Sequence, residues 1–337
     1  MVGSTHGDSA SSRSPRRPIL VTGAAGFIGS HVAEGLAARG DTVVGVDNFH
    51  PYYDPGRKRA NLQEAQAAGG ERLTFVEGDI RDRDLIRSLF DRYRFRAVAH
   101  LAALAGVRAS VENPAAYYDV NVQGSLVLLD AAAAADVEVF VGASTSSVYG
   151  LGAPIPFAES DRADRPLAPY AASKRAVELL AHSYHHLYGL NITMLRFFTV
   201  YGPRGRPDML AYKVLHNILS GDHVPLYNGG QMHRDWTYVG DVTAGVIAAL
   251  DRPLGYEIIN IGRGEPVLLA DFVRLLEEVS GNPASLTPAP PPDTDLPYTY
   301  ADVSKARRLL GYEPATSVAE GVRAFWEWFR AAVPAGD

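Results

Sequence analysis

The sequence predicts an α/β protein in which a doubly wound parallel sheet carries a smaller C-terminal α/β lobe. Short apolar runs alternate with amphipathic stretches through the first half of the chain, a pattern typical of βαβ units. A glycine-rich segment directly follows the first of these runs. With 337 residues, 47% of them hydrophobic, the chain is long enough to bury both a large sheet and a companion lobe.

Five apolar runs are expected to form the first buried strands: Pro18–Thr22, Thr42–Asp47, Leu73–Val76, Ala97–His100 and Val137–Ala143. A long helix is expected from Pro169 to Tyr188, because proline favours the first helical turn and Gly189 supplies the C-terminal cap. Another strand, Ile192–Arg196, follows it.

Three regions are expected along the chain. Residues 1–17, rich in Ser, Gly and Arg, predict a disordered tail. Residues 18–200 predict mainly the sheet domain. Residues 201–332, broken by Pro and Gly clusters, predict mainly a second lobe, with some chain returning to the sheet.

Composition excludes several classes of function. The net charge of −6 gives no basic field for a nucleic acid backbone, so no nucleic acid partner is expected. The absence of cysteine excludes disulfides, thiolate metal sites and a cysteine nucleophile. No run of about 18 apolar residues occurs, so we expect no membrane association and a cytoplasmic protein.

The glycine-rich segment Gly23-Ala24-Ala25-Gly26-Phe27-Ile28-Gly29 lies between the first strand and a helix expected to open at Ser30. Glycine at these positions lets the backbone turn tightly and approach a pyrophosphate at the helix N-terminus, as in the Rossmann fold. A plain strand-to-helix turn is the alternative interpretation of the glycines alone.

Two acidic residues follow the next strands. Asp47 stands 24 residues after Gly23 (47 − 23 = 24), where a carboxylate can bind the adenosine ribose. It favours NAD over NADP, because it would repel a 2′-phosphate. Asp79 is placed to bind the adenine, although capping of a helix that begins near Asp82 is an alternative for this region.

Tyr170 and Lys174 stand at positions i and i+4 of the expected long helix, so they share one face. A nearby ammonium and a positively charged nicotinamide would lower the pKa of tyrosine from its usual value near 10 and make Tyr170 a base. Taken alone, such a pair is more often an exposed Tyr and Lys.

Together with the run Ser144–Gly150, these motifs strongly resemble the extended short-chain dehydrogenase/reductase family, the NAD-dependent epimerases and dehydratases of nucleotide sugars. The resemblance extends from about Pro18 to about Trp328. It implies that Thr145 binds the reacting sugar oxygen, that Tyr170 is the acid/base and that Lys174 holds the nicotinamide ribose. It further implies NAD contacts at Gly23, Gly26, Phe27, Ile28, Asp47, Asn48, Asp79, Ile80, Leu101, Ala102, Ala103, Asn121, Ser144, Tyr170 and Lys174.

Ser146 and Ser147 follow Thr145 where dehydratases and decarboxylases of this family carry acidic residues. Hydroxyl groups predict redox chemistry at C4 alone, which is epimerisation by an isomerase. Three segments, 46–59, 105–108 and 196–209, resemble the UDP-glucuronate 4-epimerases in particular. UDP-glucose 4-epimerase and UDP-glucuronate decarboxylase remain alternatives, and a catalytically dead NAD-sensing protein is the alternative from another class.

A uronic acid substrate needs donors for its carboxylate. Expected donors are Ser146, Ser147, Thr199 and a loop arginine, with Arg206 favoured and Arg108 second, although either arginine could instead face phosphate or solvent.

The family pattern implies that Arg234 binds the UDP diphosphate and that Asp295 binds the uridine ribose. Pro290-Pro291-Pro292 stands where several members carry a further diphosphate arginine, so Arg234 is expected to carry more of that task. No metal is expected, since His182, His185 and His186 lack a carboxylate that would complete a zinc site. By resemblance alone, the helices near 114–135 and 169–188 are expected to form a homodimer contact.

Overall fold

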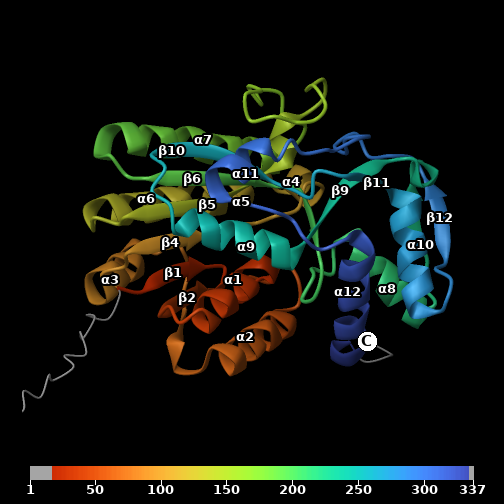
Figure 1. Cartoon of the computed structure of the whole chain (residues 1–337), viewed down its shortest axis with the longest axis horizontal. Helices are drawn as coiled ribbons and strands as arrows, with labels where there is room; N and C mark the ends of the chain where they lie inside the picture. The colour runs from red at the N-terminus through yellow and green to blue at the C-terminus, as the bar shows by residue number, and fades with distance from the viewer. Residues whose placement is uncertain (1–16, 334–337) are drawn as a thin grey trace, which may run out of the picture.

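The computed structural model describes residues 17–333, so the predicted tail lies outside the described residues except for Arg17, which forms an ion pair with Glu138. A parallel sheet of seven strands has the order β10-β6-β5-β4-β1-β2-β3 (Figure 1). Its strands are β1 (Ile19–Thr22), β2 (Val43–Asp47), β3 (Leu73–Glu77), β4 (Ala97–His100), β5 (Val139–Thr145), β6 (Ile192–Phe197) and β10 (Tyr256–Ile261). The predicted Rossmann fold class is confirmed.

Helices cover both faces of this sheet. One apolar cluster packs β-strand side chains against α1 (Phe27–Ala38), α2 (Pro55–Gly69), α9 (Val239–Leu250) and α11 (Ser304–Leu310). The opposite cluster packs them against α3 (Arg83–Tyr93), α6 (Gly124–Ala134) and α7 (Pro169–Tyr188). Between β4 and α6 the chain forms α4 (Ala109–Glu112), α5 (Pro114–Tyr117) and the π-helical turn η2 (Tyr118–Gln123). The sheet is therefore buried on both sides, as its apolar strands require.

The predicted elements fit the observed ones closely, with one clear difference. Helix α7 begins at Pro169 and ends before Gly189, whose φ of 70° closes it as predicted. Helix α1, however, begins at Phe27 and not at Ser30, because Gly26 in extended conformation serves as its N-cap. The first turn of α1 therefore lies inside the glycine-rich segment.

A smaller lobe lies beside the carboxyl ends of the strands (Figure 1). It contains α8 (Leu210–Ser220), α10 (Leu269–Ser280) and α12 (Val318–Ala332), packed around their own apolar core. Two small sheets complete it, β11-β9-β7 and β12-β8. Their strands are β7 (Thr199–Tyr201), β8 (Val224–Tyr227), β9 (His233–Tyr238), β11 (Pro266–Leu268) and β12 (Leu286–Ala289).

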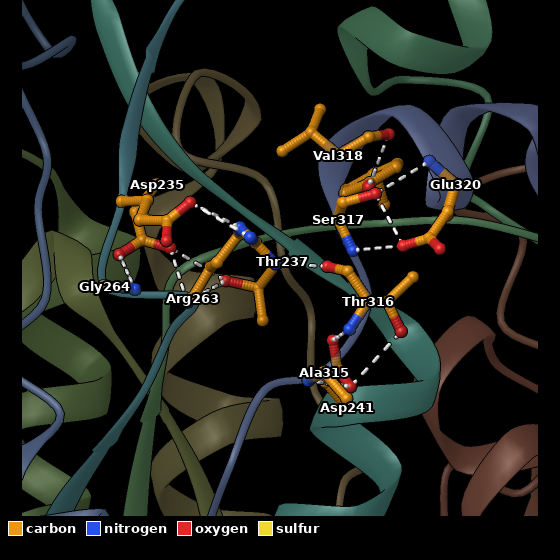
Figure 2. A network of polar contacts seen from close by, with 12 residues as sticks. Asp235, Thr237, Asp241, Arg263, Gly264, Ala315, Thr316, Ser317, Val318 and Glu320 are labelled. Carbon is orange, nitrogen blue, oxygen red and sulfur yellow. Dashed lines mark hydrogen bonds and ion pairs between the residues drawn. The ribbon is translucent and has the colours of Figure 1, made fainter.

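A buried carboxylate fixes β9, the strand that carries Arg234. Figure 2 shows that Asp235 accepts hydrogen bonds from the backbone N–H groups of Arg263 (2.7 Å) and Gly264 (2.9 Å). Burial raises the pKa of Asp235, and these donors oppose the shift. The Arg263 side chain donates to the carbonyl oxygen of Thr316 in the C-terminal segment. The same segment is held by Asp241 of α9, whose carboxylate accepts from the backbone N–H groups of Ala315 and Thr316. The strand is thus held rigidly beside the cavity described next.

In the described part of the chain, no helix combines the length and the apolar character that crossing a bilayer requires.

Candidate active site

The glycine-rich segment brings three stretches of backbone into contact. Gly23 has a φ of 72°, and a Cβ atom there would lie 2.8 Å from the backbone nitrogen of Ala102. A Cβ atom at Gly29 would lie 1.9 Å from the carbonyl oxygen of Gly23. No side chain caps the N-terminus of α1. Its free N–H groups and the bare backbone around them fit the pyrophosphate of a dinucleotide.

Asp47 lies at the carboxyl end of β2, next to this segment. Its carboxylate accepts hydrogen bonds from the backbone N–H of Phe49 (2.8 Å) and of Ala25 (3.2 Å), so its position is fixed from both sides. A carboxylate held there fits the hydroxyl groups of an adenosine ribose and repels a phosphate.

Asp79 lines the cavity at the end of β3, where Asn48 donates to it at 2.9 Å. A hydrogen bond from Arg81 lowers the pKa of Asp79 to about 2, so it is ionised. The alternative capping role belongs to Asp82 instead, which accepts from the N–H groups of Asp84 and Leu85 at the start of α3. Asp79 is therefore not used as a helix cap, and its two carboxylate oxygens accept from Asn48 and Arg81 at the wall of the cavity.

A cavity of about 700 Å³ runs along the carboxyl ends of the strands and into the smaller lobe. Its lining includes the predicted residues Gly23, Gly26, Phe27, Ile28, Asp47, Asn48, Asp79, Ile80, Leu101, Ala102, Ala103, Arg108, Ser144, Thr145, Ser146, Ser147, Tyr170, Lys174, Thr199, Arg206, Arg234 and Asp295. The structure thus brings together residues that are spread over most of the chain.

Asn121 differs from the prediction, because it does not line this cavity. It is buried behind the wall, where its amide exchanges two hydrogen bonds with the backbone of Leu104 (2.9 and 3.0 Å) and donates to Ser173 at 3.0 Å. Asn121 therefore joins the segment after β4 to α7, and its contact with a cofactor would be indirect.

Thr145, Tyr170 and Lys174 all line the cavity. Thr145 ends β5, and its hydroxyl forms a hydrogen bond with the Tyr170 side chain. One turn further along α7, Lys174 is buried and donates to the carbonyl oxygen of Ala143 at 3.0 Å. The strand end and the helix face thus bring a hydroxyl, a phenol and an ammonium group together.

Burial raises the pKa of Tyr170, and Arg206 followed by the Thr145 hydrogen bond opposes the shift. A lowering of this pKa by Lys174 was predicted from the sequence, but Lys174 is not among the groups that shift it in the structure. The cation that acts on Tyr170 within the protein is therefore Arg206, from a loop of the smaller lobe.

Lys174 itself has a shifted pKa. Burial lowers it to about 8, and the carboxylate of Glu178, one turn along α7, opposes the shift. Glu178 is fully buried and accepts from Arg196 (2.9 and 2.8 Å) and from Ser144 (2.6 Å). The ion pair of Glu178 with Arg196 therefore fixes the Ser144 hydroxyl and places a negative charge near the Lys174 ammonium group.

Arg206 is oriented by Asp208, two residues further on. Its Nε and Nη2 atoms donate to the two carboxylate oxygens of Asp208 at 2.9 and 2.8 Å, and Tyr52 donates to the same carboxylate at 3.0 Å. The ring of Tyr117 packs edge-on against Tyr170 at 6.2 Å. Tyr170 is therefore packed against the edge of Tyr117 and is influenced by the charge of Arg206.

Arg108 lies in a different cluster. It donates to Asp295 at 3.0 Å and to the Tyr227 hydroxyl at 2.9 Å, with its guanidinium 4.3 Å from the centre of the Tyr227 ring. Arg234 lies 3.8 Å from the same Asp295 carboxylate. Two arginines therefore converge at this end of the cavity, which fits a diphosphate, whereas Arg206 alone lies next to Tyr170.

No catalytic or binding role was predicted for Tyr52, Asp208, Tyr117 or Glu178. Glu178 had a detectable signal, because it follows Lys174 at the same i+4 spacing that relates Lys174 to Tyr170. Tyr52 and Asp208 lie in two of the segments that resemble the UDP-glucuronate 4-epimerases, but their contact joins positions 156 residues apart, and only the folded chain brings them together.

Among the described residues, no group of three or more His, Asp or Glu side chains is arranged to hold a metal ion. His182 and His185 pack instead against the ring of Tyr256.

The fold and the site together define a nucleotide-sugar enzyme of the Rossmann type, and residues 19–262 match the NAD dependent epimerase/dehydratase family. The chain belongs to this family. It is 44% identical to a UDP-glucuronate 4-epimerase of Thermodesulfobacterium geofontis, over 92% of this chain and 95% of that protein.

Two solved structures are similarly close. The UDP-glucuronic acid 4-epimerase of Bacillus cereus, in complex with UDP-glucuronic acid and NAD, superimposes with a TM-score of 0.86 at 36% identity, covering 93% of this chain and 99% of that one. The UDP-glucose 4-epimerase of Thermotoga maritima with UDP-glucose gives 0.86 at 33% identity, covering 94% and 100%. The fold is thus shared by enzymes named for an acidic and for a neutral sugar, and the site has to distinguish them.

Proposed function

We propose that this protein is a UDP-glucuronate 4-epimerase, an isomerase that interconverts UDP-glucuronate and UDP-galacturonate through a 4-keto sugar, with NAD as tightly bound cofactor. The observation that carries the proposal is the position of Arg206, close enough to Tyr170 to shift its pKa, in a cavity that also presents the hydroxyls of Ser146 and Ser147. A cation and neutral hydroxyl groups beside the reacting centre fit a sugar with a carboxylate at C6. The relatives named above support the same substrate.

The cofactor half of the cavity fits NAD. The first turn of α1 and the three glycines would bind its pyrophosphate, and Asp47 its adenosine ribose. When bound, NAD supplies the hydride acceptor and donor for C4 and a positive charge beside Tyr170. We assign residues 18–200 mainly to this half, and residues 201–332 mainly to the nucleotide-sugar half.

Tyr170 performs the proton transfer. Burial raises the pKa of Tyr170, and Thr145 and Arg206 oppose this rise only in part. The positive charge that bound NAD would supply favours the phenolate further, so that the phenolic oxygen can accept the proton of the C4 hydroxyl and later return it. Thr145 would hold the same sugar oxygen, and Lys174 would hold the nicotinamide ribose. These three side chains fix the donor and the acceptor at one carbon.

The diphosphate end provides the pivot. Arg108 and Arg234 would hold the diphosphate while the 4-keto ring turns and presents its opposite face to Tyr170. The pairing of Arg108 with Arg234 at Asp295 supplies a second arginine despite the prolines at 290–292.

The residues around the C6 carboxylate would prevent decarboxylation of the intermediate. A 4-keto uronic acid can lose carbon dioxide when its C5–C6 bond breaks and the electron pair passes into the ketone as an enolate. Hydrogen bonds from Ser146, Ser147, Thr199 and Arg206 would hold the carboxylate near the ring plane, where this bond overlaps poorly with the carbonyl group. The site thus favours return of the hydride over loss of carbon dioxide.

The test is to follow purified enzyme and UDP-glucuronate by NMR, with UDP-glucose in a parallel reaction. We expect UDP-galacturonate as product, no net change in NAD, and much slower reaction of UDP-glucose. Release of carbon dioxide with formation of a UDP-pentose would indicate a decarboxylase, and reaction of UDP-glucose alone would indicate a UDP-glucose 4-epimerase. NAD binding without turnover of either sugar would indicate a sensor.

We further propose a homodimer formed through α7 and the segment of η2 beside it. Leu179 and Leu187 on α7 are 57% and 67% exposed, and Tyr118 in η2 is 43% exposed, so large apolar side chains lie on the surface of both elements. Light scattering would show twice the monomer mass, and Leu187→Glu would reduce it. A cytoplasmic location stays a prediction that cell fractionation would test.

A further inference from the structure

The loop that carries Arg206 is fastened to the cofactor half of the protein. At its start, the carbonyl oxygen of Pro203 lies 2.9 Å from Nε2 of His31 on α1. The next residue, Arg204, is buried and forms ion pairs of 2.7 Å with Glu34 on α1 and with Glu64 on α2. The loop therefore rests on two helices of the sheet domain, although the chain continues from it into the smaller lobe.

The far end of this loop is held by Tyr52. The Tyr52 hydroxyl donates to Asp208 at 3.0 Å, and Asp208 binds Arg206 through both carboxylate oxygens. There is space for the Tyr52 hydroxyl because residue 106 is glycine, where a Cβ atom would lie 2.0 Å from the hydroxyl oxygen. Tyr52, Asp208 and Arg206 thus form a chain of three side chains that ends beside Tyr170.

Tyr52 lies in the loop of residues 48–54, which follows Asp47 directly, and its backbone N–H donates to the carbonyl oxygen of His50 at 2.9 Å. Asn48 accepts from the backbone N–H of His50 at 3.0 Å, and Lys58 donates to the His50 carbonyl oxygen at 2.8 Å. Asp47 and Asn48, which are assigned to NAD, therefore share one short, internally hydrogen-bonded segment with Tyr52, which contacts Arg206 through Asp208.

We propose that Tyr52 and Asp208 are positioning residues that set the selectivity of the site for a uronic acid, by holding the Arg206 guanidinium in the plane in which it meets the C6 carboxylate. This proposal rests on the proposed function. Because Nε and Nη2 are engaged by Asp208, Nη1 is the guanidinium nitrogen left to face the sugar. A guanidinium fixed by two parallel hydrogen bonds cannot rotate to follow a misplaced carboxylate, so its orientation decides binding.

Tyr52→Phe tests the proposal, since it removes one hydroxyl and leaves the ring in place. We expect the KM for UDP-glucuronate to rise about tenfold, the effect of one lost hydrogen bond to a charged group, while kcat changes less than about twofold. A measurable fraction of product should become UDP-pentose, because the carboxylate is held less firmly. The Kd of UDP-glucose should stay unchanged, which a general loss of structure would not allow.

Tyr53→Phe is the matched control. Tyr53 lies in the same loop, and its hydroxyl is buried without a hydrogen-bond partner among the described residues. The control should therefore keep the KM and the product ratio of the wild type. If Tyr52→Phe behaves like Tyr53→Phe, or if it weakens UDP-glucose and UDP-glucuronate equally, the proposal is wrong.

Asp208→Asn is a second test of whether the orientation of Arg206 sets the selectivity. It removes one of the two bonds to Arg206, so its KM effect should equal or exceed that of Tyr52→Phe. The double variant should be no worse than Asp208→Asn alone, because both changes act through one path. Additive effects would overturn the proposal. A wild-type enzyme that does not epimerise UDP-glucuronate would overturn the proposed function itself, whereas an active wild type with an unaffected Tyr52→Phe would overturn this inference alone.

Discussion

The two halves of the cavity are built in different ways. On the cofactor side, Gly23, Gly26 and Asp47 lie at or just after the carboxyl ends of the neighbouring strands β1 and β2, and Gly29 lies in the first turn of α1. The approach of Gly23 to Ala102 is long-range, but the hydrogen bonds of Gly23 to Val46 and of Ala25 to Asp47 join two strands that follow one another along the chain. On the substrate side, Arg108, Arg206 and Arg234 come from three separate segments, and each is oriented by a residue of the folded protein. The first half is specified locally and the second by tertiary contacts.

This difference explains how one fold serves several sugars. The cofactor half depends on backbone shape, which tolerates little change once the strands are paired. The substrate half depends on side chains at loop positions, where a substitution alters selectivity without disturbing the sheet. Changes in the first half should therefore abolish the reaction, and changes in the second half should redirect it.

The largest expected effect is that of a substitution at Tyr170, which lies where the cofactor half and the substrate half of the cavity meet. Tyr170→Phe removes the proton acceptor while keeping the ring that packs against Tyr117. We expect kcat for UDP-glucuronate to fall by about 10³-fold, within the range of general acid/base catalysis, with NAD still bound. Single-turnover assays together with NAD fluorescence would measure both effects. Substantial residual turnover would show that another group accepts the proton.

Gly29→Ala tests the local character of the cofactor half. The new Cβ atom would lie 1.9 Å from the Gly23 carbonyl oxygen, so the backbone must move, at a cost of about 1–3 kcal/mol. We expect NAD affinity to fall by up to about 100-fold and the melting temperature to drop. Gly35→Ala in the same helix is the control, since its Cβ atom would meet only side-chain carbons of Ile247 and Thr243 at 3.1 and 3.3 Å. Equal effects of the two variants would refute a special role for Gly29.

The extent to which sequence predicted this site follows the same division. The limits of α7 were predictable, because Pro169 and Gly189 act on the backbone where they stand. The start of α1 was placed three residues too late, since extended Gly26 caps the helix without any side-chain signal. The residues predicted to bind the cofactor line the cavity, apart from Asn121, whose direction into the protein interior depends on how α7 packs.

The substrate half could be predicted only as a set of candidates. Sequence favoured Arg206 over Arg108 for the carboxylate but did not separate their environments. The structure separates them, because Arg108 lies with Arg234 and Asp295, whereas Arg206 lies with Asp208 and acts on Tyr170. The contact of Arg108 with Asp295 spans 187 positions and that of Tyr52 with Asp208 spans 156, so no periodicity or local motif encodes these two contacts.

A comparison of Arg206→Ala with Arg108→Ala sharpens this assignment. Arg206→Ala should raise the KM for UDP-glucuronate by about 10- to 100-fold, as expected for the loss of a charged hydrogen-bonding partner, and should release carbon dioxide. Its affinity for UDP alone should not change. Arg108→Ala should weaken UDP, UDP-glucose and UDP-glucuronate by similar factors. The reverse pattern, measured by calorimetry with the three ligands, would exchange the two roles.

The smallest expected effect is a dependence on pH that reaches across both halves. Because burial lowers the pKa of Lys174 to about 8, its ammonium form is present below that pH and is lost above it. NAD affinity, measured by fluorescence titration, should therefore fall severalfold between pH 7 and pH 9 if Lys174 holds the nicotinamide ribose. Glu178 raises this pKa, so Glu178→Gln should move the decline to lower pH, whereas Lys174→Arg should remove it, since arginine stays charged. A decline that persists unchanged in Lys174→Arg would have to come from another group, and the buried ammonium would then have no part in binding the cofactor.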